Sequence, residues 1–329
     1  MKTVPTTSRL ALRALTACLI AVSTGAHAQD SYPTKPIRII VPAAAGGGAD
    51  ITARMIAPRL SEHLGQQVVV ENQGGGGTVI GMERVARAAP DGYTLAIALS
   101  SLTITPYVMP KLPYNPAKDF APISQVLRAP SILVSHPSLP ARSLKELIAF
   151  VKANPAKLSY ASPGFGGNQH LGMELFLLAT GLKMGPAHYK GMAPAVADVV
   201  AGHVPMIIGD VLGVMPHIKA GRLRAYGVTS ANRVSVAPDV PTIAEAGVPG
   251  FEVVQWFGIL APANTPRDII AKLHAGTVYA VQDPATKEHF IRAGGQLVGS
   301  TPEEFAAVIR DDLKKWGKVI KDAGIEPQQ

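Results

Sequence analysis

Cysteine is almost absent from this chain, since Cys18 is the only one among 329 residues. It lies within residues 1–28, where basic residues, an apolar run and the small-residue sequence Ala26-His27-Ala28 follow one another as in a secretory signal. We expect cleavage after Ala28, which leaves a mature chain that can form neither a disulfide nor a thiolate metal site. A lipid-attachment site at Leu15–Cys18 is the competing interpretation, but most of the apolar run follows the cysteine.

Long apolar runs and runs of a single charge are missing as well. Beyond the signal, no stretch of about 18 uncharged apolar residues occurs, so no membrane span is predicted. Lys and Arg number 31, Asp and Glu number 23, and loss of three basic residues with the signal lowers the net charge from +8 to about +5. Without a basic run, this mild excess predicts no nucleic-acid partner, although it favours the arrival of anions.

The chain also lacks the short motifs of nucleotide-binding and hydrolytic sites. The glycines at 46–48 are not followed by Lys-Ser/Thr as in a P-loop, and Ile51 stands where a dinucleotide-binding turn has its third glycine. His170 and Glu174 do not have the HExxH order, and no GxSxG elbow occurs. We therefore predict no cofactor, no metal and no catalytic residue.

What the chain does contain is a repeated alternation of strands and helices, over a length sufficient for roughly two domains. This alternation predicts an α/β fold with mainly parallel sheets flanked by helices. The predicted strands are 37–41, 68–70, 94–99, 123–136, 158–161, 185–189, 205–209, 223–229 and 253–261. The predicted helices are 50–64, 79–88, 144–152, 168–180, 192–201, 212–220 and a terminal helix from Thr301. Residues 105–122 are predicted to form a proline-rich loop.

The first strand ends in a glycine-rich turn that opens a helix. Ala43, Ala44, Ala45, Gly46, Gly47 and Gly48 follow the strand, and Asp50 is well placed as the N-cap of the helix. A helix start has unpaired N–H groups and a partial positive charge, and small residues let a ligand reach the backbone. The turn therefore predicts an anion site, while an ordinary βα turn that needs glycine only for its backbone stays open as the alternative.

The same arrangement recurs about 120 residues later. Ser162-Pro163-Gly164-Phe165-Gly166-Gly167-Asn168 follows the strand at 158–161 and opens a helix that Gly181 ends. Thr78 closes a third glycine loop, and Ser100 and Ser101 follow the strand at 94–99. Because ligands bind outside the carboxyl ends of parallel strands, we expect these loops to serve one ligand.

Two side chains outside the glycine turns are candidates for the same site. His170, in the first turn of the second helix, can donate to a bound anion or can simply pack on its neighbours. Asp210 ends a strand and can bind an ammonium group or cap a helix. The candidate ligand-binding residues are Ala43, Ala44, Ala45, Gly46, Gly47, Gly48, Asp50, Thr78, Ser100, Ser101, Ser162, Gly164, Phe165, Gly166, Gly167, Asn168, His170 and Asp210.

A secreted α/β hydrolase is the alternative from another functional class. Its nucleophile would be Ser100, Ser101 or Ser162, and each of these serines lacks a base nearby in the sequence. A triad need not be local in sequence, so the hydrolase stays open at this point.

Several longer segments together resemble one known family. They are Gly46-Gly-Gly-Ala-Asp50, Leu64-Gly-Gln-Gln-Val-Val-Val-Glu-Asn72, Pro90-Asp-Gly-Tyr-Thr94, Tyr189-Lys-Gly191 and Thr301-Pro-Glu-Glu-Phe305. The chain resembles the Bug or TctC family, the extracytoplasmic solute receptors of tripartite tricarboxylate transport, from about Tyr32 to Ile325. In the family a bulkier residue, commonly Phe, often stands where this chain has Ala43, which implies a wider pocket here.

The resemblance implies a two-domain type II periplasmic binding fold, also called a Venus flytrap. Domain 1 would comprise 29–127 plus 256–329 and domain 2 would comprise 128–255, with crossovers near Leu127–Ile132 and Val253–Gly258. It also implies a periplasmic, monomeric receptor that binds a small organic carboxylate through the loops 43–48 and 162–168. Such a receptor is not an enzyme, and it delivers its ligand to membrane transporter subunits or presents its liganded form to a sensor kinase.

Overall fold

The computed structural model describes residues 32–109, 111–154 and 158–327. The predicted signal at 1–28 and its cleavage site lie outside the described residues. Lys35–Gln329 form one compact unit, separate from Met1–Thr34, and the description below concerns this unit.

A first group of strands is built on β1 (Ile37–Val41), which lies between β2 (Val68–Asn72) and β3 (Thr94–Leu99) in parallel pairing. All of β1 except Arg38 is buried, as its β-branched sequence predicts. β9 (Val254–Pro262) continues the sheet antiparallel to β3. β1 and β2 each end at a glycine-rich turn, whereas β3 is followed by Ser100 and α4.

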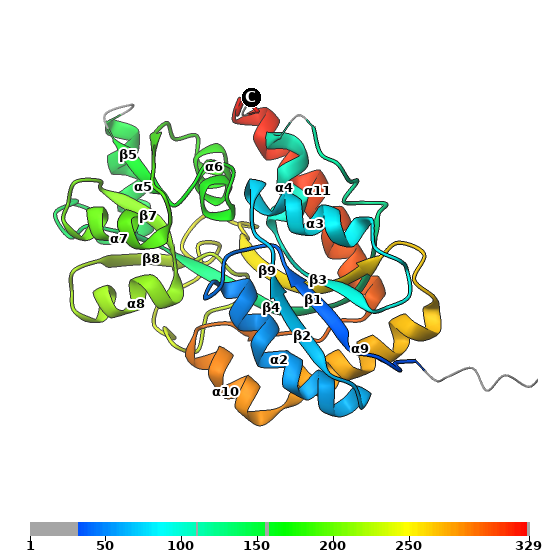
Figure 1. Ribbon diagram of the computed structural model, residues 1–329. Helices are drawn as coiled ribbons and strands as arrows, with labels where there is room; N and C mark the ends of the chain where they lie inside the picture. The colour runs from blue at the N-terminus through cyan, green and yellow to red at the C-terminus, as the bar shows by residue number, and fades with distance from the viewer. Residues whose placement is uncertain (1–31, 110, 155–157, 328–329) are drawn as a thin grey trace, which may run out of the picture. The chain divides into compact units, whose positions relative to one another are not determined.

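The long strand β4 (Phe120–Ser135) belongs to two groups of strands. Its first part, up to Pro130, pairs antiparallel with β9 and thus completes the first strand group. Its last part, from Ser131, lies between β7 (Met206–Asp210) and β8 (Arg224–Val228). β5 (Ser159–Ser162) and β6 (Gly185–His188) extend this second strand group in parallel pairing. β4 can be followed in Figure 1 from one strand group into the other.

The helices cover these strands. Their bounds are α2 (Gly48–Leu64), α3 (Val79–Ala86), α4 (Ser101–Val108), α5 (Leu144–Ala153), α6 (Asn168–Thr180), α7 (Met192–Val200), α8 (Val211–Lys219), α9 (Arg267–Gln282), α10 (Pro284–Arg292) and α11 (Pro302–Asp322), with a short 3-10 turn η1 at Gly76–Thr78 and a short strand β10 at Gln296–Leu297. Within the described residues, no helix is both long enough and apolar enough to cross a bilayer.

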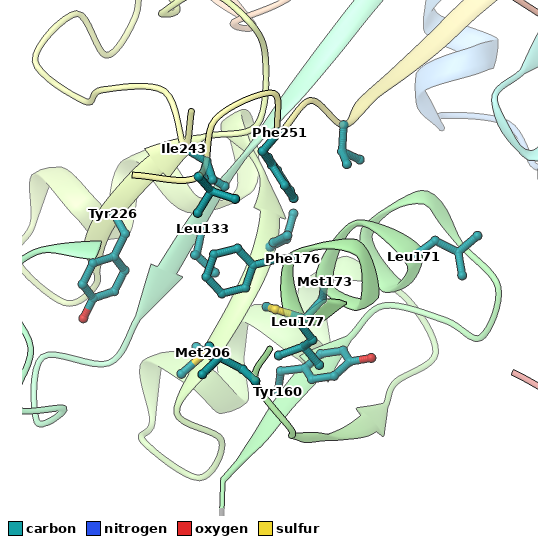
Figure 2. Close-up of a cluster of buried hydrophobic side chains, with 14 of the residues drawn as sticks. Leu133, Tyr160, Leu171, Met173, Phe176, Leu177, Met206, Tyr226, Ile243 and Phe251 are labelled. Atoms are coloured by element: carbon teal, nitrogen blue, oxygen red, sulfur yellow. The ribbon is translucent and has the colours of Figure 1, made fainter. Parts of the chain in front are cut away.

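α11 contributes to two of the hydrophobic cores, one under each strand group. Phe305 and Ile309 pack with Ile40 and Leu260 of the first group. Trp316, near the other end of α11, joins a core whose buried side chains include Phe176, Phe251 and Met206. Figure 2 shows this second core, where side chains of α6 lie against those of β4 and β7.

Most predicted strands and helices are confirmed, with one clear error. Residues 105–122 were expected to be a loop, but α4 covers Ser101–Val108 and includes Pro106. Burial of the apolar side chains of Leu102, Ile104 and Val108 stabilises this helix. The hydroxyl of Thr105 adds to it by donating to the carbonyl oxygen of Ser101 at 2.7 Å. These interactions outweigh the hydrogen bond that proline removes.

The absence of a side chain at Gly258 is required for the contact between β9 and α11. A Cβ atom there would lie 2.3 Å from Cζ of Phe305 and 2.9 Å from the carbonyl oxygen of Ser124, and Phe305 is fully buried. We predict that Gly258→Ala lowers the free energy of unfolding by about 1–3 kcal/mol, through overpacking. Urea denaturation measures this change. Gly185→Ala in β6 is the matched control, because nothing lies within 4 Å of its added Cβ. Equal stability of the two variants would contradict the prediction.

Candidate functional site

The two glycine turns have the same backbone geometry. Gly46 and Gly166 both have left-handed φ values, of 80° and 65°. The next residues, Gly47 and Gly167, are the N-caps of α2 and α6, with φ/ψ of −79°/167° and −76°/164°. The prediction of a repeated strand, glycine turn and helix is therefore confirmed, and each turn delivers the chain to its helix in the same way.

Asp50 holds the first turn from inside α2. It was expected to be the N-cap, but it is the third residue of the helix, and this expectation is wrong. Its Oδ2 atom accepts a hydrogen bond from the N–H of Gly46 at 2.8 Å, and its Oδ1 atom accepts one from Nε of Arg54 at 2.9 Å. Burial acts to raise the pKa of Asp50, but the hydrogen bonds from Gly46 and Arg54 hold that pKa below its usual value.

His170 occupies the equivalent position in α6 and makes the equivalent bond. Its Nδ1 atom accepts a hydrogen bond from the N–H of Gly166 at 3.0 Å, and its side chain is 3% exposed. Burial, together with neighbouring His188, lowers the pKa of His170 to about 4. The imidazole is therefore neutral near pH 7 with its proton on Nε2, which lies 3.9 Å from Oε1 of Glu174. Nδ1 holds the loop and is not a donor to an anion.

The beginning of α6 also carries a side-chain donor without a partner. Asn168 is the first residue of α6 and is 6% exposed, yet its Nδ2 has no hydrogen-bond partner among the described residues. Phe165 lies beside it in the turn, with its ring centroid 5.5 Å from that of His170 and 5.7 Å from that of His188. The second turn thus combines free helix N–H groups, one orphan amide and a wall of aromatic rings.

The loop serines differ in their hydrogen-bond partners. Ser162 is buried and its hydroxyl donates to the carbonyl oxygen of Gly164 at 3.0 Å. Ser100 precedes α4 and its N–H donates to the carbonyl oxygen of Trp256 at 3.1 Å. The hydroxyls of Ser101 and Thr78 are buried and have no partner within the part of the chain that the structure describes. No hydrogen bond from a histidine or a carboxylate to these serines occurs among the described residues.

Asp210 links the start of α6 to β4. It stands at the N-cap position of α8, but its side chain makes no cap hydrogen bond, so the expectation of a capping role is wrong. Its Oδ1 atom accepts from Nε2 of Gln169 at 2.6 Å and from Oγ of Ser131 at 3.5 Å. Burial raises the pKa of Asp210, while the hydrogen bonds from Gln169 and Ser131 act in the opposite direction.

A cavity of about 310 Å³ brings Gly48 and Asp210 together. β4 and β9 form one wall of it, and the starts of α2 and α8 and the end of α10 form the others. The lining residues are Gly48, Ile51, Leu127, Ala129, Pro130, Met192, Asp210, Val211, Leu212, Gly213, Gln255, Phe257, His289, Phe290, Ala293, Gly294 and Gly295. The second turn, Thr78 and the loop serines do not line this cavity. A more open hollow of about 710 Å³ lies along Pro106–Asp119 and contains none of the candidate residues.

Several lining residues of this cavity were not predicted from the sequence. Phe257 lies on β9, and Phe290 comes from α10, far along the chain from both glycine turns. Ile51 stands close after the glycine turn in the sequence. This closeness was the one feature of the sequence that could have marked Ile51 as a lining residue. Among the described residues, no group of three or more histidine, cysteine, aspartate or glutamate side chains could hold a metal ion.

Comparison with known proteins identifies the family. The model of the tripartite tricarboxylate transporter family receptor, TctC, matches residues 52–325. The chain belongs to the TctC family. Protein BugT of Bordetella pertussis is 40% identical over 297 residues, which are 90% of this chain and 91% of BugT. Among solved structures, an R. palustris protein with adipate is 35% identical with a TM-score of 0.77, covering 90% of this chain and 100% of that one. MatC from Rhodopseudomonas palustris with bound malate is 30% identical with a TM-score of 0.74, covering 88% and 100%.

Membership of the TctC family confirms the resemblance and the fold class. TctC proteins are extracytoplasmic solute-binding receptors and not enzymes, and their folds are those of periplasmic binding proteins. The hydrolase alternative is therefore discarded. Within this chain the sheet is parallel around β1 and around β5, and antiparallel where β4 and β9 meet.

The depressed pKa of His170 makes the stability of this TctC protein depend on pH. The unfolded chain takes up a proton near the usual pKa of 6.5, whereas the folded chain resists it down to about 4. The stabilising contribution of neutral His170 is thus complete above 6.5 and is lost as the pH falls toward 4. We predict that His170→Asn, whose amide oxygen can accept the same bond without titrating, loses less stability over this range than the wild type.

Urea denaturation at several pH values between about 7 and 4 measures this difference. Burial also lowers the pKa of His188 and raises the pKa of Glu174. These two groups make stability depend on pH in the wild type and in the variant alike. The comparison is therefore between the two slopes. Parallel curves for wild type and His170→Asn would contradict the assignment of a neutral, loop-holding His170.

Proposed function

We propose that this chain is a periplasmic receptor that binds a small organic carboxylate and delivers it to a tripartite tricarboxylate transporter. The observation that carries the proposal is the pair of matching turns, 43–48 and 162–168, each ending at a helix start. At each turn a buried side chain, Asp50 or His170, holds the left-handed glycine in place. The turns are therefore preorganised before a ligand arrives.

A carboxylate suits such turns better than a neutral group does. A helix N-terminus favours an anion by roughly 0.3–1 kcal/mol when exposed and by up to about 2 kcal/mol when partly buried. Hydrogen bonds from backbone N–H groups to a charged acceptor add roughly 1.5–3 kcal/mol each. The orphan amide of Asn168 is a further donor at the start of α6. The adipate and malate found with two relatives support the same chemical class.

Family membership and the sequence support the proposed location and partner. In the proposal, the signal at 1–28 directs export and is cleaved after Ala28, and the mature chain acts as a monomer. The membrane transporter receives the ligand from the receptor. A sensor kinase is the alternative recipient of the liganded form and differs only in the identity of the partner.

The first expected outcome concerns charge. A carboxylic acid identified by a thermal-shift screen of mono- and dicarboxylates, amino acids and sugars should bind at least about tenfold more tightly than its own amide, because the amide gains little from either helix start. Titration calorimetry on the acid and the amide measures the ratio. Sugars as the best ligands, or equal affinities for acid and amide, would contradict the proposal.

A matched pair of variants links this affinity to the second turn. Nothing lies within 4 Å of a Cβ added at Gly164, and the same is true of Gly185 in β6. Gly164→Val should therefore leave stability nearly unchanged but weaken carboxylate binding, since its side chain enters the open space beside the turn. Gly185→Val should change neither property. Undiminished affinity of Gly164→Val would place the ligand elsewhere.

The second expected outcome concerns closure. We propose that 29–127 plus 256–329 form one domain and 128–255 the other, with β4 and β9 as the two crossovers between them. Domains joined by two short crossovers close on a ligand by a hinge motion. Small-angle scattering of the receptor saturated with its best carboxylate should give a smaller radius of gyration than the free receptor. Superimposable curves would argue against the hinge.

A further inference from the structure

The cavity next to Gly48 is apolar over most of its lining. Phe257, Val211, Leu127 and Phe290 contribute buried side chains, each no more than 5% exposed. The ring of Phe257 approaches the helix start closely, since a Cβ added at Gly48 would lie 2.9 Å from its Cζ atom. A group bound at the beginning of α2 therefore has an apolar chamber directly beside it.

Two exposed apolar side chains stand at the edge of this chamber. Ile51 of α2 is 39% exposed and Leu212 of α8 is 61% exposed, although both line the cavity. Exposed side chains of this size are covered when an apolar group binds between them, and burial of apolar surface stabilises the complex by about 25 cal/mol per Å². The edge of the chamber thus favours a ligand whose body is apolar.

The charged groups of the chamber also favour a ligand with an apolar body. Neither lysine nor arginine lines it among the residues that the structure describes, so a second carboxylate on the ligand would meet no cation there. The carboxyl group in the lining is that of Asp210, whose Oδ1 atom is bonded to Gln169 and Ser131. Its Oδ2 atom accepts no hydrogen bond from the described residues and can accept one from a ligand. Asp210 therefore suits a hydroxyl or ammonium group and not a carboxylate.

From these contacts we infer that the receptor selects a monocarboxylate with an apolar body, such as an alkyl chain or a ring, over dicarboxylates and tricarboxylates. The inference rests on the proposed function and specifies the substrate class of the same site. The single carboxylate binds at the glycine turns, the apolar body fills the chamber, and a hydroxyl or ammonium group on the body can donate to Asp210. A second carboxylate would be buried beside apolar side chains and the carboxyl group of Asp210, without a lysine or arginine partner, which is unfavourable.

Hexanoate and adipate are the decisive pair of probes, because they share a six-carbon chain and differ by the second carboxylate. Titration calorimetry on the purified mature receptor should show that hexanoate binds at least about tenfold more tightly than adipate. Cyclohexanecarboxylate should also bind more tightly than adipate, and malate and citrate should bind weakly. Tighter binding of adipate than of hexanoate overturns the inference but leaves the proposed carboxylate receptor standing. No binding of any of these carboxylates overturns both.

A charge placed at the edge of the chamber should reverse the preference. Ile51→Arg puts a guanidinium beside the cavity at a position exposed enough to accept it, so it should raise adipate affinity relative to hexanoate at least about tenfold. Leu178→Arg is the matched control, since Leu178 is 40% exposed on α6 and does not line the cavity. This control should keep the wild-type ratio. An unchanged ratio in Ile51→Arg, with its melting temperature retained, overturns the assignment of the chamber to the body of the ligand.

Discussion

The antiparallel ladder between β4 and β9 is the constraint on which the rest of the structure depends. It runs from Phe120 paired with Pro262 to Pro130 paired with Val254. Because successive side chains of a strand point to opposite faces, Leu127 and Phe257 face the apolar cavity while Arg128 and Trp256 face the other side. There Nε1 of Trp256 donates to Oδ2 of Asp312 at 2.7 Å, which anchors α11. One ladder therefore forms a wall of the apolar cavity and anchors α11 on its other face.

The sequence was sufficient for the elements whose signals are local. The β-branched run of β1, the glycine turns and the left-handed stop at Gly181 were all predicted correctly, because each depends on a few consecutive residues. The capping box of Thr301 and Glu304 is present for the same reason. The predictions that were wrong concern contacts with residues distant in the sequence. α4 forms despite Pro106 because its apolar side chains are buried, and the side chain of Asp210 bonds to Gln169 and Ser131 instead of capping α8.

The site shows the same division between local and distant information. Sequence spacing was enough to find both turns, but not to show that the third residue of each helix holds the turn. The chamber could not be predicted at all, since its walls come from α2, β4, β9, α8 and α10.

The two turns also differ electrostatically. The lowered pKa of Asp50 keeps a negative charge at the start of α2, whereas neutral His170 leaves the positive end of α6 uncompensated. The negative charge of Asp50 is paired with Arg54, so the two turns differ in the ionic state of the residue that holds them.

The position of α11 across both hydrophobic cores has a consequence for how the protein is made. Phe305 completes the core of the first strand group, and Trp316 completes the core of the second. Neither core is closed until residues 302–322 have been synthesised. The strands of both groups are made much earlier. Until α11 has been made, the apolar side chains that it covers stay exposed, and the nascent chain remains incompletely packed.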